Sequence, residues 1–140
     1  MKDLQNNISV VSLLDPVVVS ATATITDIDL AGFNSAVLVI AFGLDAGTGL
    51  SASHQLDFVL YDSPDGTTYS VVETADMVDT TVTAGSIFTL NDTDLDNAVY
   101  QFGYVGGQRY LQLIYTETGT VSCPMSIMLI KGHPSDAPIL

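Results

Sequence analysis

A two-residue alternation of apolar and polar side chains runs through much of this 140-residue chain and restricts its fold more than any other feature. Successive side chains of a strand point to opposite faces, so this period predicts strands with one buried and one exposed face. Residues 17–30 show the pattern most clearly, and we predict a half-buried strand there. One face carries Val17, Val19, Ala21, Ala23 and Ile25, and the other carries Ser20, Thr22, Thr24 and Thr26.

Turn residues divide the rest of the chain into further short strands. We predict these strands at residues 36–42, 56–61, 68–73, 87–90, 98–104, 109–116 and 120–130, with a single helical turn near 74–79. The apolar run at 36–42 is typical of a central strand buried on both faces. Turn residues at 62–66, 106–107 and 117–119 predict hairpins between neighbouring strands. About eight strands at this spacing indicate an all-β fold, an antiparallel β-sandwich with jelly-roll or immunoglobulin-like topology.

The length favours one domain over residues 1–140, with an extended arm at each end. Residues 1–9 are polar and mixed, and they lack the basic-then-apolar layout of a secretion signal, so we expect synthesis in the cytoplasm. Residues 132–140 contain Pro134 and Pro138, and we expect them not to continue a strand. The apolar pair Ile139 and Leu140 needs a surface on which to dock, on the same subunit or on a neighbour.

The charge balance restricts the partners. The chain has 16 acidic and 3 basic residues, a net charge of −13, so it lacks the basic patch that nucleic acids or anionic membranes require. No apolar run approaches the ~18–20 residues of a membrane-spanning helix. Only 14% of residues are charged and 47% are hydrophobic, which is a low charge density for a lone monomer. We therefore expect other subunits or partners to cover some apolar faces.

No group of residues in the sequence indicates catalysis, a cofactor or a metal cluster, and we expect a protein that is not an enzyme. The histidines, His54 and His133, are isolated from each other and form neither a triad nor a metal site. Cys123 is the only cysteine, so it cannot form an intrachain disulfide, and we interpret it as a small core residue. The absence of tryptophan and of a cysteine pair counts against an antibody-type domain.

Three further features leave alternatives open. The carboxylates of residues 91–97 alternate as they do in calcium loops, but Asn97 and Gly103 stand where an EF-hand needs Gly and Glu, so a solvated acidic connection is favoured over a calcium site. Arg109, one of three cations, is expected to form an ion pair within the subunit or across an interface. Core packing is favoured over a sugar-binding platform for four tyrosines. These are Tyr100, Tyr104, Tyr110 and Tyr115.

Five short stretches, spread in order over almost the whole chain, resemble a family of small proteins from the virion-structure modules of tailed bacteriophages. They are MKDLQNNI at 1–8, DLAGFNSA at 29–36, DSPDG at 62–66, YVGGQRYL at 104–111 and GHPSDAP at 132–138. The family consists of capsid auxiliary proteins, called decoration, cement or head-stabilising proteins. It has no catalytic residues, so the resemblance implies none here.

The resemblance implies a small β-rich virion protein that binds the outer surface of the capsid, contacts the major capsid protein, and stabilises the expanded shell. It also implies a homo-oligomer, with a trimer expected. We expect the two arms and Arg109 to supply the contacts with the shell or with neighbouring copies. The expected interface residues are Lys2, Leu4, Ile8, Arg109, His133, Pro134, Pro138, Ile139 and Leu140.

Two other functions remain open at this stage. A carbohydrate- or receptor-binding β-sandwich on the virion would require exposed aromatic side chains in one cleft. A structural protein of the neck or tail would be present in a few copies per particle, whereas a decoration protein would be present in hundreds.

Overall fold

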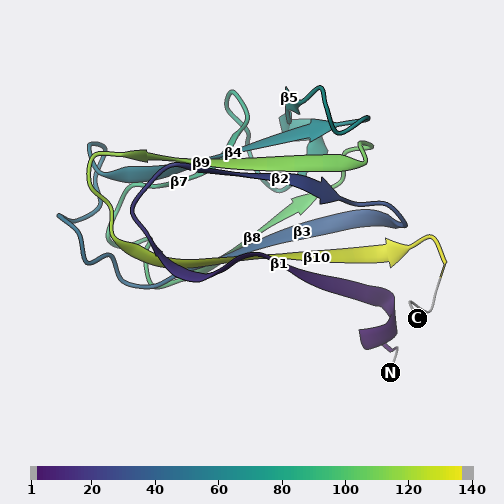
Figure 1. The fold of residues 1–140 in the computed structure, drawn as a ribbon, viewed down its shortest axis with the longest axis horizontal. Helices are drawn as coiled ribbons and strands as arrows, with labels where there is room; N and C mark the ends of the chain where they lie inside the picture. Colours follow the sequence, from purple (N-terminus) through teal and green to yellow (C-terminus); the bar gives the residue numbers. More distant parts are fainter. Residues whose placement is uncertain (1–2, 137–140) are drawn as a thin grey trace.

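Two antiparallel sheets face each other across a single layer of core side chains in the computed structural model, which describes residues 3–136 (Figure 1). Sheet A has the strand order β1-β10-β3-β8-β6, and sheet B has the order β2-β9-β4-β5, with β7 also paired to β4. The strands are β1 Ile8–Val19, β2 Ala23–Asp29, β3 Phe33–Phe42, β4 Gln55–Ser63, β5 Ser70–Val71, β6 Met77–Val78, β7 Ser86–Leu90, β8 Val99–Tyr104, β9 Tyr110–Thr118 and β10 Cys123–Pro134. Two 3₁₀ turns, η1 Gln5–Asn7 and η2 Thr74–Asp76, complete the elements. The prediction of an all-β sandwich is confirmed.

The strand pairing follows jelly-roll topology. β1 pairs with β10, β2 with β9, β3 with β8, and β4 with β7, every pair antiparallel. The chain therefore resembles one long hairpin in which the first half of the strands pairs with the second half in reverse order. This hairpin is wrapped so that its strand pairs alternate between the two sheets. This arrangement decides between the two topologies that the sequence leaves open, in favour of the jelly roll.

The core lies between the sheets and includes a cluster of aromatic rings. Phe42 of sheet A packs edge-on against Phe58 of sheet B with 5.7 Å between ring centroids, and Phe88 lies 4.5 Å from Tyr100. Phe58 is fully buried. Cys123 is fully buried as well, which confirms its interpretation as a core residue, and burial raises the pKa of its thiol to about 11. The two sheets are thus held together mainly by apolar packing.

Several local predictions are wrong. β1 is missed, because the polar residues before Ile8 and the Asp15-Pro16 pair obscure its pattern, and the predicted strand at 17–30 is broken where the chain crosses from sheet A to sheet B. The hairpins predicted at 106–107 and 117–119 are crossings between the sheets, since β8 and β10 lie in sheet A and β9 lies in sheet B. The hairpin at 62–66 and the turn at Thr74–Asp76 are confirmed.

β10 also continues beyond its predicted end. It runs to Pro134, which is paired with Phe33 of β3, so the predicted arm at 132–140 is wrong for residues 132–134. Proline is tolerated there because the pairing with β1 begins at Gly132, so Pro134 has a neighbouring strand on one side only, as in an edge strand. His133 adopts a left-handed backbone conformation (φ 50°), its carbonyl oxygen accepts a bond from Asn34 Nδ2 at 2.9 Å, and its Nδ1 lies 2.7 Å from Ser35 Oγ. These bonds fix the start of the C-terminal arm against β3.

No helix among residues 3–136 is long and apolar enough to cross a membrane.

We predict that Phe58→Ala lowers the free energy of unfolding by about 3–5 kcal/mol, because it removes a fully buried ring at the centre of the aromatic cluster. Urea unfolding followed by circular dichroism measures this loss. Thr116→Ala, at an exposed position on the outer face of sheet B, should change the same quantity by no more than about 0.5 kcal/mol. A loss below about 1 kcal/mol for Phe58→Ala would contradict the assigned core.

Candidate interaction surface

The outer face of sheet A is an apolar surface built from five strands. Residues directly opposite each other in neighbouring strands share a face, so the register defines its rows. One row crosses the sheet through Val10, Ile130, Val37, Gly103 and Val78. The next rows contain Ser12, Met128, Val39 and Gln101, and then Ser126, Ala41 and Val99. We call Val10, Val37, Val39, Val78, Val99, Met128 and Ile130 the sheet A face.

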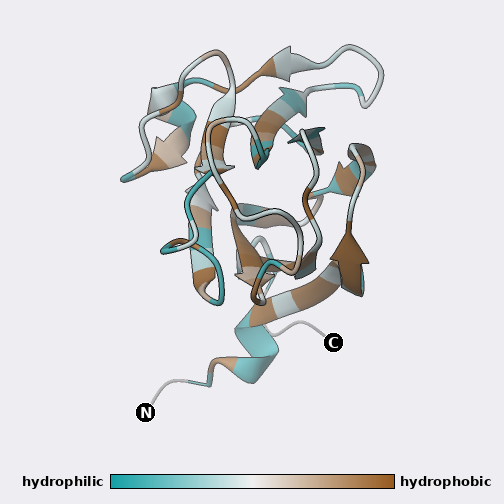
Figure 2. Ribbon diagram, turned by 90° about the vertical axis from the view of Figure 1, so that its left-hand side faces the viewer, coloured by the Kyte–Doolittle hydropathy of each residue, from teal (hydrophilic) through white to brown (hydrophobic). Residues whose placement is uncertain are grey.

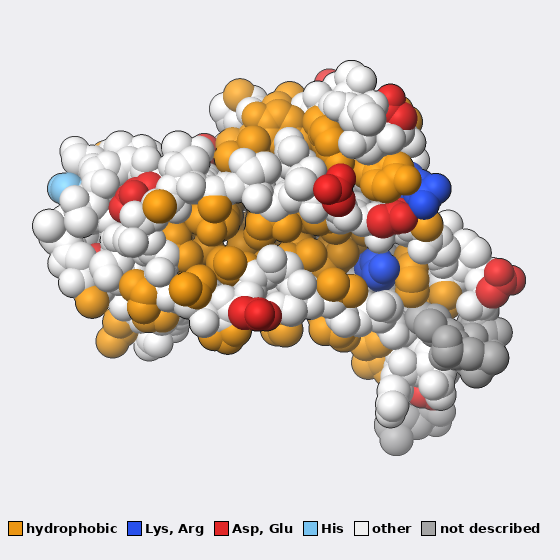
Figure 3. Space-filling model, in the orientation of Figure 1, with side chains coloured by type: hydrophobic (Ala, Val, Ile, Leu, Met, Phe, Trp, Pro, Cys, Tyr) orange, Lys and Arg blue, Asp and Glu red, His pale blue; other side chains and the backbone are white. Residues whose placement is uncertain are grey.

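This face is only partly covered in the monomer. The alternate residues Leu38, Ile40 and Phe42 of β3 are buried against sheet B, but Val37 and Val39 are half-buried. The prediction that the strand at 36–42 is buried on both faces is therefore wrong for this monomer. Val99 is 68% exposed and Val10 is 56% exposed. In Figure 3, hydrophobic side chains also gather along the side of the molecule formed by β1 and β10.

The centre of the sheet A face lacks charge, and carboxylates occur only at its two edges. Asp15 of β1 accepts a hydrogen bond from Ser12 Oγ at 2.7 Å, and Asp79 borders a pocket with Val37 and Val78. Strands β3, β8 and β10 contain no carboxylate, and their one charged residue is Lys131. Lys131 lies opposite the buried Ala36 and thus on the inner side of the sheet, where its Nζ is 4.8 Å from the centre of the Phe33 ring. Sheet B, in contrast, carries carboxylates on three of its strands. They are Asp27 and Asp29 on β2, Asp57 and Asp62 on β4, and Glu117 on β9.

A shallow groove of about 360 Å³ lies at one end of the sheet A face. Its apolar walls come from Leu4 and Ile8 at the N-terminal side, Val37 and Ile130 in the sheet, and Pro134 at the C-terminal side. The structure thus brings together four of the expected interface residues, since His133 also borders the groove. Lys2, Pro138, Ile139 and Leu140 lie outside the described residues.

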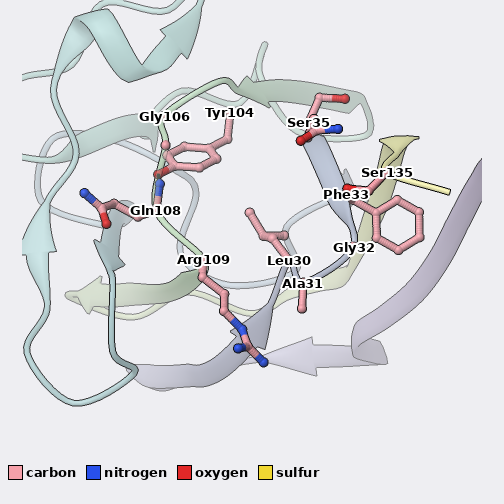
Figure 4. Close-up of a pocket in the computed structure, with 12 residues that line it drawn as sticks. Leu30, Ala31, Gly32, Phe33, Ser35, Tyr104, Gly106, Gln108, Arg109 and Ser135 are labelled. Atoms are coloured by element: carbon pink, nitrogen blue, oxygen red, sulfur yellow. Dashed lines mark hydrogen bonds between the residues drawn. The ribbon is translucent and has the colours of Figure 1, made fainter.

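Arg109 forms the expected ion pair within the subunit. Its Nε and Nη2 donate to the two carboxylate oxygens of Asp29 at 2.9 and 2.8 Å. This bidentate contact joins the β8–β9 connection to the end of β2 and borders a polar pocket (Figure 4). Its hydrogen bonds lower the pKa of Asp29 to about 2. Arg109 is therefore occupied by an internal partner and lies apart from the groove.

Tyr104 lines that pocket and anchors the β8–β9 connection. The Tyr104 hydroxyl donates to Asp62 Oδ2 at 2.7 Å and accepts from the Gln108 backbone N–H at 3.3 Å. Burial and the neighbouring carboxylate raise the pKa of Tyr104, and burial raises the pKa of Asp62. Gly106 is required because a Cβ at that position would collide with the Tyr104 hydroxyl. These contacts position the β8–β9 connection rather than present reactive groups.

The remaining candidate residues have structural partners. Asp96 accepts the Asp45 backbone N–H at 2.9 Å, and His54 Nδ1 accepts the Thr120 backbone N–H at 2.9 Å. Within residues 3–136, no group of three His, Cys, Asp or Glu side chains is arranged to hold a metal. Of the four tyrosines considered for sugar binding, Tyr104 and Tyr115 are buried and Tyr100 and Tyr110 are half-buried, so none forms an exposed platform.

No protein-family model and no curated protein matches the chain. Among solved structures, it is similar to the SPBc2 prophage-derived protein YomS, with a TM-score of 0.44 and 10% identity over 91% of this chain and 94% of that one. It is similar to a structure of the Gx strain of infectious bursal disease virus, with a TM-score of 0.39 and 16% identity over 94% of this chain and 33% of that one. For a Yersinia pseudotuberculosis-derived mitogen the TM-score is 0.32 and the identity 10%, over 90% and 96% of the two chains. All three TM-scores lie below 0.5.

We predict that Asp29→Asn destabilises the protein by less than about 1 kcal/mol at pH 6 and by a smaller amount at pH 2.5. The Arg109 side chain is 53% exposed and that of Asp29 is 41% exposed, so solvent screens the pair. The pKa of Asp29 is about 2 in the folded state and 3.8 as its ordinary value, so its stabilisation is present above pH 4 and is lost as the pH falls toward 2. Urea unfolding of both proteins at the two pH values measures the difference. An equal difference at both would contradict the assigned role of the pair.

Proposed function

We propose that this protein is a virion structural protein of a tailed bacteriophage that binds the outside of the capsid as a decoration protein and stabilises the expanded shell. The observation that carries the proposal is the sheet A face, a partly exposed apolar surface whose central strands carry no carboxylate on a chain with a net charge of −13. The resemblance of the sequence to phage decoration proteins supplies the partner, the major capsid protein. The sheet A face supplies the surface for that contact.

The distribution of charge supports an oriented contact. A docking surface gains free energy from buried apolar area and loses it for each carboxylate that is desolvated without a partner. The centre of the sheet A face meets both conditions, because its side chains are apolar and β3, β8 and β10 carry no carboxylate, and Asp15 and Asp79 lie only at its edges. The acidic side chains of sheet B other than Asp62, which is bonded to Tyr104, would then face solvent, where they would repel other particles and keep a crowded surface soluble.

The groove extends this surface toward the two ends of the chain. Leu4, Ile8 and Pro134 line it, so the first and last described segments border the same contact area. In this proposal they contribute to shell binding together with the sheet A face. A protein that binds only the expanded shell stabilises that form by mass action, and one copy at each lattice position multiplies the effect.

The alternatives have less support. A glycan-binding role calls for exposed aromatic side chains in a cleft, whereas the tyrosines near the polar pocket are buried or half-buried. A neck or tail protein would also need an interaction surface, and it differs from a decoration protein in its copy number.

We predict that Met128→Lys weakens binding to expanded, undecorated shells of the source phage by at least about tenfold, because it places an ammonium in the centre of the apolar contact. Met128 is 39% exposed, so the substitution is compatible with folding. Co-sedimentation of the purified protein with the shells measures the affinity.

Val71→Lys is the matched control. Val71 is an apolar residue of β5 in sheet B with 42% exposure. The Val71→Lys protein should therefore bind the shells with the affinity of the wild-type protein. Wild-type binding by Met128→Lys, or an equal loss in both variants, would refute the sheet A face as the contact. Failure of the wild-type protein to bind the shells at all would refute the proposed function.

A further inference from the structure

β1 leaves one side of its backbone without a partner strand in the described part of the chain. It is the terminal strand of sheet A, pairs with β10 on its other side, and is 12 residues long. An edge strand exposes a row of backbone N–H and C=O groups that can pair with another strand. Folded proteins ordinarily interrupt such edges with charge, proline, bulges or short length.

The other edges carry these interruptions. The opposite edge of sheet A is β6, which has two residues. In sheet B, β2 contains a bulge at Asp27, where the register shifts and the backbone φ is 59°, and Asp29 adds a second charge. The far edge of sheet B is divided between β5, with two residues, and β7, with five.

β1 is interrupted from Leu13 onward. Register shifts occur between Ser12 and Val17, and this part contains Asp15 and Pro16. The first half, ISVVSL at residues 8–13, has no charge and no proline, and its register with β10 is regular from Ile8 to Ser12. Val10 and Val11 are both exposed. Figure 2 shows this change of character, since the ribbon turns from hydrophilic to hydrophobic directly after the N-terminal turn.

We propose that two copies of this chain associate by antiparallel pairing of residues 8–13, which joins two five-stranded A sheets into one continuous sheet. Antiparallel pairing about a two-fold axis is self-complementary, so a second copy supplies a strand of the required length and character. A pairing centred on Val10 or Val11 places identical valines opposite each other. The N–H and C=O groups on the free side of β1 in each copy then become hydrogen-bond partners for those of the other copy.

The charges of the chain favour this location for a contact between copies. Two molecules of net charge −13 repel each other wherever their carboxylates meet. The pairing described above places Asp15 of one copy near Gln5 or Asn7 of the other, so no carboxylates are opposed. A two-fold axis perpendicular to the sheet also leaves both sheet A faces on the same side. The pair would thus present a doubled apolar surface, although the inference does not depend on shell binding.

This assembly is a dimer, in contrast to the trimer that the sequence resemblance implies. Sedimentation equilibrium of the full chain over a range of concentrations should show a monomer–dimer equilibrium. Val10→Lys should raise the dissociation constant at least about tenfold, because a lysine on the edge opposes strand addition. Val105→Lys should leave it unchanged, since Val105 is a comparably exposed valine beyond the end of β8.

Hydrogen exchange tests the backbone pairing directly and does not require a variant. The amides of residues 8–13 that do not face β10 should exchange more slowly as the protein concentration rises. A monomer at all concentrations, a trimer, or a dimer that Val10→Lys leaves intact would overturn the proposal. Protection of these amides that is independent of concentration would also overturn it, because it would show that the chain covers its own edge.

Discussion

A two-layer sandwich can seal only one face of each sheet, and this constraint governs the surface of the molecule. In β3 the inward residues Leu38 and Ile40 are fully buried against sheet B, but the outward residues Val37 and Val39 are apolar too. The sheet that holds the core together therefore has a second apolar side that the monomer leaves partly open. Folding alone does not require this second side, and binding to another surface would account for it.

The acidic residues are arranged consistently with such a contact. Most of them occur on sheet B and in the connections, Asp15 lies on the edge strand β1, and the three central strands of sheet A have none. Because the net charge is −13, a random placement of carboxylates would put several on any large face. The molecule is thus polarised, with one surface suited to desolvation and another suited to water. Such polarity is useful for a protein that coats a larger assembly from one side.

Local sequence patterns predicted the strands better than their connections. The alternation at Tyr100, Phe102 and Tyr104 correctly places these rings toward the core, and the turn at 62–66 correctly predicts a hairpin. Gly106 and Gly107 mark a reversal of the chain, but turn chemistry does not specify which sheet the next strand joins. That choice depends on contacts between strands distant in sequence, such as β1 with β10. For the same reason the sequence left the jelly-roll and immunoglobulin-like topologies unresolved.

The sequence predicts only the residues of the groove at one end of the candidate surface. Their positions near the termini made Leu4, Ile8 and Pro134 expected interface residues, and all three line one groove in the structure. The sheet A face was missed because its members come from five strands, and Val99 or Met128 alone resembles an ordinary strand residue. The continuous apolar run at 36–42 did contain a signal. It correctly indicates two apolar faces, but a single chain buries only one.

Quantitative mass spectrometry of purified particles of the source phage, counting this chain against the major capsid protein, tests the central claim most directly. A decoration protein that occupies the whole shell predicts a ratio near one copy per capsid subunit. A ratio of a few copies per hundred subunits would contradict decoration and indicate a neck or tail protein, and absence from the particles would contradict a virion role altogether.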